Sequence, residues 1–193
     1  QLTMTAFGPF GGECEISFEQ MGTHGIFLIS GDTGAGKTTI FDGICFALFG
    51  EASGDTRKTD SLRSGYAKED TATQVRLIFL HRGERYEIVR NPEYMRQSKR
   101  GNGMTPQKQD ALLLCPDGSQ VSGFRQVSAA IIQLLGVDKN QFKQISMIAQ
   151  GEFMKLLNAS SEDRGKIFRS VFNTMPHYQL QLRLGQLERE LAG

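Results

Sequence analysis

The sequence predicts an α/β fold built around one strand–loop–helix unit, and three adjoining stretches support this. The apolar run GIFLIS at 25–30 is typical of a strand in a parallel sheet that is covered on both faces. The stretch GDTGAGKT at 31–38 follows, with two glycines five residues apart and then Lys37 and Thr38. Residues 38–49 have helical periodicity, and Gly50 is placed to end that helix. The helix is expected to bury a stripe made of Phe41, Ile44, Cys45, Leu48 and Phe49.

The glycine-rich stretch has the spacing of a phosphate-binding P-loop. Its glycines allow tight backbone turns, so that successive N–H groups can face a phosphate. Lys37 is expected to reach the β- and γ-phosphates of a nucleotide, and Thr38 to offer its hydroxyl to Mg²⁺. A chance glycine loop is the alternative, but the strand before it and the helix after it favour a phosphate site.

Composition limits the class of protein without naming it. The chain has 193 residues, of which 39% are hydrophobic and 22% charged, as expected for a globular domain with a real core. The net charge of +1 neither requires nor excludes nucleic acid, so any DNA-binding surface must be a local patch. No apolar run is long enough to predict a membrane span. Three scattered cysteines favour a reducing cytoplasm over a disulfide framework.

Alternation of apolar and polar residues predicts further strands, and turn residues separate them. The predicted strands are 2–7, 14–18, 74–81, 85–90, 111–115 and 144–149. Glycine-rich residues 8–12 are expected to connect the first two strands, and a tight turn at 82–84 to connect the next two. These strands predict an antiparallel β subdomain beside the parallel strand of the loop unit, and therefore a mixed sheet.

Helices are predicted in the second half of the chain. One runs from Ser122, as N-cap, to Leu135 and ends at Gly136, and another covers 160–172. A heptad seam follows, with spacings of four, three and four, made of Leu180, Leu184, Leu187 and Leu191. The seam predicts a lobe over 1–175 and the start of a coiled coil over 176–193. An ordinary amphipathic terminal helix is the alternative.

Two polar stretches leave alternatives open. Residues 51–72 are interpreted as a loop over the nucleotide site or as a mobile solvated loop. Its candidate phosphate or base contacts are Arg57, Lys58, Arg63 and Ser64. Residues 92–109 are interpreted as a long basic loop at a hairpin tip, which either touches DNA phosphates or is merely solvated. Its basic residues are Arg96, Lys99, Arg100 and Lys108.

Parts needed for ATP hydrolysis are absent from the sequence. No run of four or five apolar residues is followed by Asp-Glu, and the nearest run, 77–80, ends in His81. The stretch VSGF at 121–124 lacks the second glycine and the acid of an ABC-type signature. The sequence therefore predicts half of a nucleotide-binding machine, which another segment or another chain must complete.

Three segments together resemble the SbcC family of SMC-like ATPases, the ATPase subunits of bacterial SbcCD nucleases. They are LTMTAFGPF at 2–10, GDTGAGKTTIFD at 31–42 and IAQGEF at 148–153. The resemblance covers nearly all of the chain and implies the N-terminal lobe of an ABC-type ATPase head. A structural, condensin-like SMC head is the alternative, and the sequences GPF at 8–10 and QGEF at 150–153 argue against it.

The resemblance implies roles for individual residues. Gln150 matches a glutamine that ligates Mg²⁺ and senses the γ-phosphate, and so joins Lys37 as a candidate catalytic residue. Phe7 to Pro9 match a segment near the adenine and ribose, and Arg63 and Ser64 match a stretch that approaches the nucleotide. The phosphate cradle corresponds to Asp32, Thr33, Gly34, Ala35, Gly36, Lys37, Thr38 and Thr39.

The resemblance also implies partners and an activity of the whole protein. Expected partners are the C-terminal lobe of the same protein, a second ATPase head, the nuclease SbcD and double-stranded DNA. ATP–Mg²⁺ is the expected cofactor, and ATP hydrolysis is expected only when the C-terminal lobe supplies the missing motifs. The expected role is ATP-powered processing of DNA ends in double-strand break repair.

Overall fold

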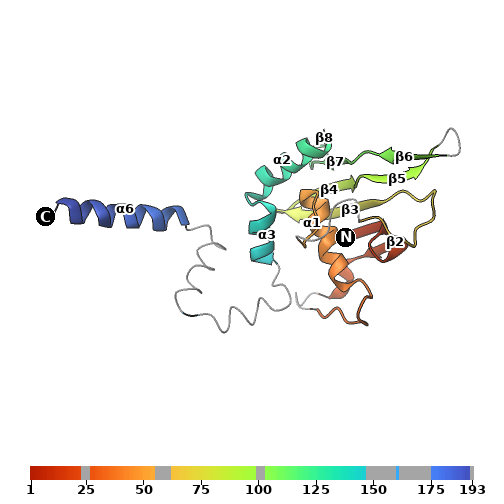
Figure 1. Cartoon of the computed structure of the whole chain (residues 1–193), viewed down its shortest axis with the longest axis horizontal. Helices are drawn as coiled ribbons and strands as arrows, with labels where there is room; N and C mark the ends of the chain where they lie inside the picture. Colours follow the sequence, from red (N-terminus) through yellow and green to blue (C-terminus); the bar gives the residue numbers. More distant parts are fainter. Residues whose placement is uncertain (23–26, 55–61, 99–102, 147–159, 161–174, 192–193) are drawn as a thin grey trace. The chain divides into compact units, whose positions relative to one another are not determined.

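The computed structural model describes residues 1–22, 27–54, 62–98, 103–146, 160 and 175–191. The chain divides into two units, Gln1–Gly136 and Val137–Gly193. The first unit holds a six-stranded sheet in the order β2-β1-β3-β4-β7-β8 and a separate β5–β6 hairpin (Figure 1). The strands are β1 (Leu2–Phe7), β2 (Phe10–Ile16), β3 (Gln74–His81), β4 (Glu84–Asn91), β5 (Tyr94–Gln97), β6 (Met104–Gln107), β7 (Asp110–Leu114) and β8 (Gln120–Ser122). Among the described residues, no helix has the length and apolar character that a membrane crossing needs.

The antiparallel part of the predicted sheet is confirmed. Strands β1 and β3 have the predicted bounds, and β4 and β7 differ from prediction by one residue at each end. The β3–β4 hairpin turns through Arg82 and Gly83, whose φ angles are 53° and 84°. Two consecutive positive φ angles match the twist of the flanking strands, which explains why a two-residue turn suffices here.

Two strand predictions near the N-terminus are corrected. Strand β2 begins at Phe10, so the turn between β1 and β2 is shorter than the predicted 8–12. The predicted parallel strand at 25–30 is not formed over the described residues 27–30, and Leu28 is 89% exposed. A strand that is apolar on both faces requires neighbouring strands and two covering layers. Every strand pairing in the described chain is antiparallel, and none involves residues 27–30.

Helix α1 (Lys37–Phe49) is confirmed within one residue, and Gly50 ends it with φ 80° and an N–H bond to the Phe46 carbonyl. The predicted buried stripe is partly wrong, because Phe41 is 41% exposed whereas Ile40 and Phe46 are buried. Helix α2 (Phe124–Leu135) ends at Gly136 as predicted. Its N-cap is Gly123, not Ser122, because Ser122 pairs with Leu112 as the last residue of β8.

Helices α1 and α2 pack on one face of the sheet (Figure 1). Gly43 of α1 lies directly on β1, since a Cβ there would meet Met4 Sδ at 2.7 Å. The buried side chains of this face come from alternate positions of four strands and from both helices. They include Leu2, Met4, Val75, Leu77, Ile88, Leu113, Val127 and Ile131.

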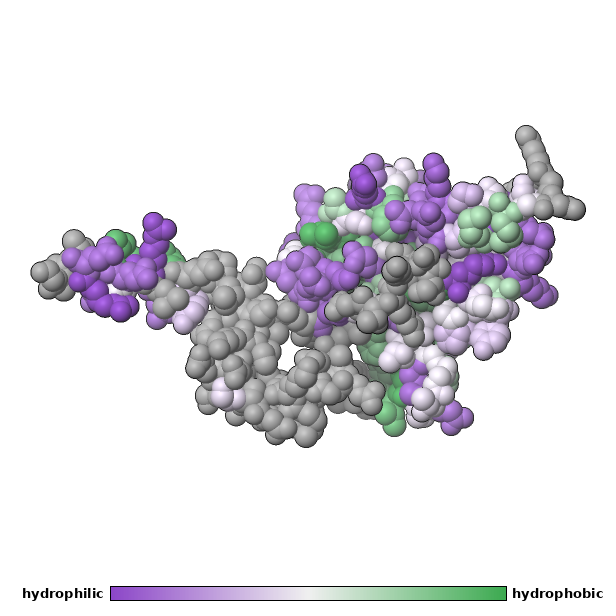
Figure 2. Space-filling view, in the orientation of Figure 1, coloured by the Kyte–Doolittle hydropathy of each residue, from purple (hydrophilic) through white to green (hydrophobic). Residues whose placement is uncertain are grey.

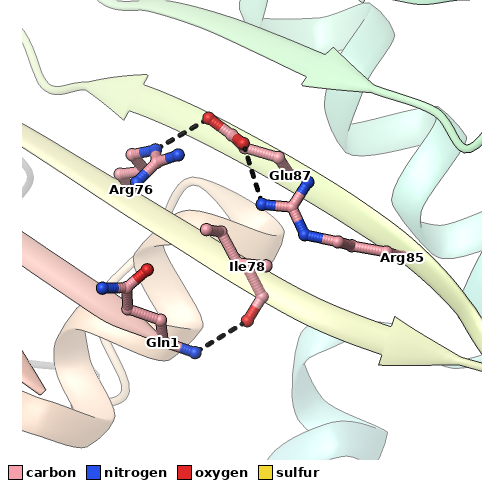
Figure 3. A network of polar contacts seen from close by, with 5 residues as sticks. All are labelled: Gln1, Arg76, Ile78, Arg85 and Glu87. Atoms are coloured by element: carbon pink, nitrogen blue, oxygen red, sulfur yellow. Dashed lines mark hydrogen bonds and ion pairs between the residues drawn. The ribbon is translucent and has the colours of Figure 1, made fainter. Parts of the chain in front are cut away.

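The other face of the sheet carries charged and polar side chains (Figure 3). Glu87 of β4 accepts a hydrogen bond from Arg76 Nε of β3 at 2.7 Å, and it lies 3.6 Å from Arg85 Nη2. The Gln1 amino group donates to the Ile78 carbonyl at 3.1 Å and so extends the β1–β3 pairing by one residue. The pairing of charges across β3 and β4 therefore follows from the alternation that buries Leu77 and Ile88 on the opposite face.

The predicted basic loop at 92–109 contains secondary structure instead. Strands β5 and β6 pair from Tyr94↔Gln107 to Gln97↔Met104, with the tip at 99–102 outside the described residues. Tyr94 is 8% exposed, and its buried ring ties the base of this hairpin to the rest of the unit. The alternation of buried and exposed side chains along β5 explains why this stretch forms a strand.

The second unit contains helix α3 (Lys139–Ser146), and the strand predicted at 144–149 is wrong over its described residues. The Asp138 carboxylate accepts a bond from the Gln141 N–H, and the Gln141 side chain accepts one from the Asp138 N–H, both at 2.9 Å. This reciprocal pair is a capping box, a helix-start signal that overrides the short apolar run. The helix predicted at 160–172 lies outside the described residues, except for Ser160.

Helix α6 (Met175–Leu191) carries the predicted leucine seam. Leu180, Leu184 and Leu187 are 57%, 57% and 46% exposed. Apolar and charged residues lie beside one another on this helix in Figure 2. The helix is thus confirmed, and its pairing in a coiled coil stays a prediction, as does the lobe boundary at 175.

Candidate nucleotide-binding site

The glycine loop lies immediately before α1, as the sequence predicts. Gly34 and Gly36 have φ angles of 88° and 91°, and the Ala35 N–H donates to the Asp32 carbonyl at 3.1 Å. Gly36 is the N-cap of α1, and its carbonyl accepts a bond from the Thr39 N–H at 3.0 Å, so the first helical turn follows the loop directly. Residues 31–35 are exposed, and the first turn of α1 contains no acid. This arrangement presents backbone donors and the positive end of a helix dipole to solvent, which suits an anion.

Lys37 folds back over the loop that precedes it. Its Nζ donates to the Gly31 carbonyl at 2.6 Å and to the Asp32 carbonyl at 2.8 Å. Those two bonds hold the ammonium group against the backbone at the start of the loop, five and six residues earlier in the chain. An ammonium retains a third N–H for an incoming phosphate oxygen. Thr38 is exposed, so its hydroxyl is accessible to a ligand, whereas Thr39 is buried.

The turn between β1 and β2 packs against the glycine loop. A Cβ on Gly36 would lie 2.8 Å from both Pro9 Cγ and Phe10 Cζ. A Cβ on Gly8, whose φ is 57°, would lie 2.6 Å from Thr39 Cγ2. Both glycines are therefore required by close contact as well as by backbone angle. The stretch that the resemblance places near the adenine thus adjoins the loop, and Phe10 is a contact that the sequence reasoning did not single out.

Residues 62–64 lie beside the end of β1, with an isolated antiparallel bridge at Arg63. Arg63 bridges Phe7, the Gly8 N–H donates to the Leu62 carbonyl, and the Ser64 N–H donates to the Ala6 carbonyl, both at 2.8 Å. Ser64 is buried, and its Oγ accepts a bond from the Tyr66 N–H. The segment is therefore adjacent to the β1–β2 turn, but the Arg63 guanidinium binds other parts of the chain. Arg57 and Lys58 lie outside the described residues.

Arg90 is a buried cation that sequence reasoning missed. Its Nε donates to the Ala47 carbonyl at 2.6 Å and its Nη2 to the Leu48 carbonyl at 2.9 Å, both in the last turn of α1. Its guanidinium lies 5.0 Å from the Phe124 ring centroid, and burial lowers the pKa of Arg90 to about 10. Arg90 follows Ile88 by two residues in β4, so its side chain falls on the core-facing side of the strand. This two-residue spacing is visible in the sequence and could have predicted that Arg90 is buried.

The donor set fits ATP–Mg²⁺ in the part that the structure describes. Lys37, the exposed backbone of residues 31–35 and the Thr38 hydroxyl supply a cation, N–H donors and an oxygen ligand. The packing around position 36 leaves no room for a side chain, and glycine has none. Gln150, the second predicted metal ligand, lies outside the described residues, and its role stays a prediction.

A glycine-rich loop of this spacing at the start of a helix packed on a sheet is typical of the P-loop class of nucleotide-binding proteins. The chain belongs to the AAA domain family, whose model matches residues 1–192.

The chain is also similar to curated relatives that are named as the SbcC component of the nuclease SbcCD, which confirms the predicted resemblance. It is 40% identical to the Vibrio cholerae protein over 188 residues, which are 95% of this chain and 19% of that relative. It is 37% identical to the Staphylococcus haemolyticus protein over 197 residues, covering 98% of this chain and 19% of the relative. It is 38% identical to the Lactococcus lactis protein over 182 residues, which cover 90% of this chain and 17% of that relative. The chain thus spans about a fifth of the length of these relatives.

Proposed function

We propose that this chain is the N-terminal nucleotide-binding lobe of an SbcC-like ATPase. The observation that carries the proposal is the position of Lys37, whose ammonium is held by two carbonyls of the glycine loop at the start of α1. Relatives that match nearly the full length of this chain are named as components of a nuclease, which supports the assignment to an SbcC-like ATPase.

In this proposal the residues divide into a cradle and a metal side. The backbone from Asp32 to Gly36 and the Lys37 ammonium bind and orient the phosphates, while the Thr38 hydroxyl and Gln150 hold Mg²⁺. When bound, Mg²⁺ neutralises charge on the phosphate oxygens. The segment at 62–64 and the turn at 7–10 border the nucleotide. Hydrolysis requires an acid that orients the attacking water, and that acid comes from the C-terminal lobe.

The partners of the whole protein follow from the same proposal. A C-terminal lobe of the same protein completes each site, and a second ATPase head closes on it. SbcD is the nuclease partner, and double-stranded DNA is the substrate whose ends are processed. The leucine seam of α6 then begins a coiled coil, and the protein acts in the cytoplasm.

Nucleotide titration of the full-length protein tests the proposal. Lys37→Ala removes the charge aimed at the phosphates and should lower affinity for a fluorescent ATP analogue by an order of magnitude or more. Lys108→Ala is the matched control, because it removes an exposed lysine near β6. Equal affinity of the two variants would contradict the assignment of the P-loop.

Gln150→Ala separates binding from ATP-driven closure. It should leave affinity largely intact and impair ATP-driven dimerisation of the heads, measured by crosslinking. The isolated 193-residue chain should bind ATP weakly and show negligible turnover, because it lacks the Asp-Glu pair. Sustained turnover by that chain, abolished by Lys37→Ala, would refute this part.

A further inference from the structure

Arg63 lies where the candidate nucleotide site meets the β5–β6 hairpin. On one side, its backbone bridges Phe7, next to the turn that packs on Gly36 and Thr39. On the other side, its guanidinium reaches the loop that leads from Ser64 into β3. Sequence reasoning placed Arg63 among the nucleotide contacts, whereas the structure shows both terminal nitrogens of its guanidinium bound to acceptors of this chain.

The contacts of the Arg63 guanidinium are numerous and specific. Nη1 donates to the Thr71 carbonyl and to Thr73 Oγ1, both at 2.7 Å, and Nη2 donates to the Lys68 carbonyl at 2.9 Å. The guanidinium carbon lies 4.7 Å from the centroid of the Tyr94 ring. A planar fork that binds three acceptors and stacks on a ring uses properties that lysine does not share.

The acceptors of Arg63 are themselves fixed to the base of the hairpin. The Thr73 N–H donates to the Tyr94 hydroxyl at 3.2 Å, and both residues are buried. Gln97 of β5 donates to the Glu69 carboxylate of the same loop. The backbone of Tyr66 also packs on β2, since a Cβ on Gly11 would lie 2.6 Å from the Tyr66 carbonyl oxygen. The loop at 64–73 is thus joined to β2 near its start and to the hairpin at Glu69 and Thr73.

We infer that Arg63 is a positioning residue and not a phosphate ligand. It fastens the loop at 64–73 to the base of the β5–β6 hairpin, and through the segment at 62–64 it holds the β1–β2 turn against the P-loop. The inference rests on the proposed nucleotide binding. Its consequence is that loosening the loop, even at residues away from the P-loop, weakens nucleotide binding.

Charge-conserving and remote substitutions distinguish positioning from direct binding. A phosphate ligand tolerates Arg63→Lys, because the charge is kept, and is indifferent to Tyr94→Leu. A positioning residue does not tolerate Arg63→Lys, because a single ammonium nitrogen cannot replace two guanidinium nitrogens that bind separate acceptors, and it has no planar group to stack on the ring. Thr73→Val, which removes one acceptor at nearly constant volume, should then share the defect. Tyr86→Leu is the control, since it removes a ring that stacks on Phe79 in the main sheet.

The experiment measures binding of a fluorescent ATP analogue to the full-length protein, well below the thermal midpoint of each variant. Arg63→Lys, Tyr94→Leu and Thr73→Val should each weaken binding by roughly 3- to 30-fold, the range of couplings carried by packed networks. They should also speed proteolytic cleavage within 64–73. The double variant Arg63→Lys with Thr73→Val should be less than additive, and Tyr86→Leu should leave affinity and cleavage unchanged.

Two results would overturn the inference. Arg63→Lys with near-normal affinity, beside a strong loss in Arg63→Gln, would show that the charge itself binds the nucleotide. Lowered thermal midpoints with unchanged affinity and cleavage would reduce Arg63 to a stabilising residue. Failure of the proposed function is separately visible, because Lys37→Ala would then leave binding unchanged, while the cleavage assay still tests the link between Arg63 and the loop.

Discussion

Replacing Arg90 tests how the P-loop helix is anchored at its far end. The guanidinium is fully buried and donates to the Ala47, Leu48 and Phe124 carbonyls, the last at 3.3 Å. The first two acceptors are orphan carbonyls of the last turn of α1. We expect Arg90→Lys to be more destabilising than Arg90→Met, although lysine is the conservative choice by charge.

The magnitude follows from these contacts. A hydrogen bond to a charged group contributes roughly 1.5–3 kcal/mol, and an ammonium at position 90 would lose about two of the three while still carrying a buried charge. Arg90→Lys should therefore cost about 3–5 kcal/mol. Arg90→Met also leaves carbonyls unsatisfied, but it removes the desolvated charge, so its net cost should be about 1–3 kcal/mol. Total stabilities of about 5–15 kcal/mol make both losses measurable.

Urea denaturation at pH 7 gives the free energy of unfolding, provided that the m-values of the variants agree. Burial lowers the pKa of Arg90 from the ordinary value of an arginine to about 10. A base with a lowered folded-state pKa adds stability only as pH rises between those two values. Arg90 therefore stays protonated and contributes no pH dependence near neutrality. A milder effect of Arg90→Lys than of Arg90→Met would refute the reasoning, since it would mean that water reaches the group.

Three further predictions concern the P-loop, the leucine seam and the basic hairpin. Gly36→Ala should be about 1–3 kcal/mol less stable than Gly34→Ala in urea unfolding. Both glycines have positive φ angles, but only a Cβ at position 36 collides with Pro9 and Phe10. Equal losses of unfolding free energy in the two variants would contradict this contact. Leu184→Glu with Leu187→Glu should abolish self-association of the chain in sedimentation, whereas a monomeric parent chain would count against a coiled-coil seam. Neutralising the basic hairpin in the complete complex should reduce the slope of log DNA affinity against log salt concentration by about 0.9 per phosphate contact, and it should leave nucleotide affinity unchanged. An unchanged slope would mean that the hairpin is solvated and does not touch DNA. The substituted residues would be Arg96, Lys99, Arg100 and Lys108.

Local chemistry in the sequence was enough for much of this lobe. The P-loop, the bounds of α1 and its end at Gly50 follow from glycine angles and helical periodicity, which act within a few residues. Strands β1, β3, β4 and β7 follow from alternation, and the β3–β4 turn follows from its spacing. These features were predictable because each depends on neighbours in the chain.

Tertiary structure decided what depends on distant partners. The apolar stretch at 25–30 does not form a strand over residues 27–30, because strand formation needs a neighbouring strand and not only an apolar sequence. The burial of Arg90 and the engagement of Arg63 by Tyr94 bring together residues 31 to 43 positions apart, which no local pattern encodes. The sequence alone therefore determined the glycine-rich loop and the helix that follows it, and the packing of distant segments decided where the charged side chains of Arg63 and Arg90 are bound.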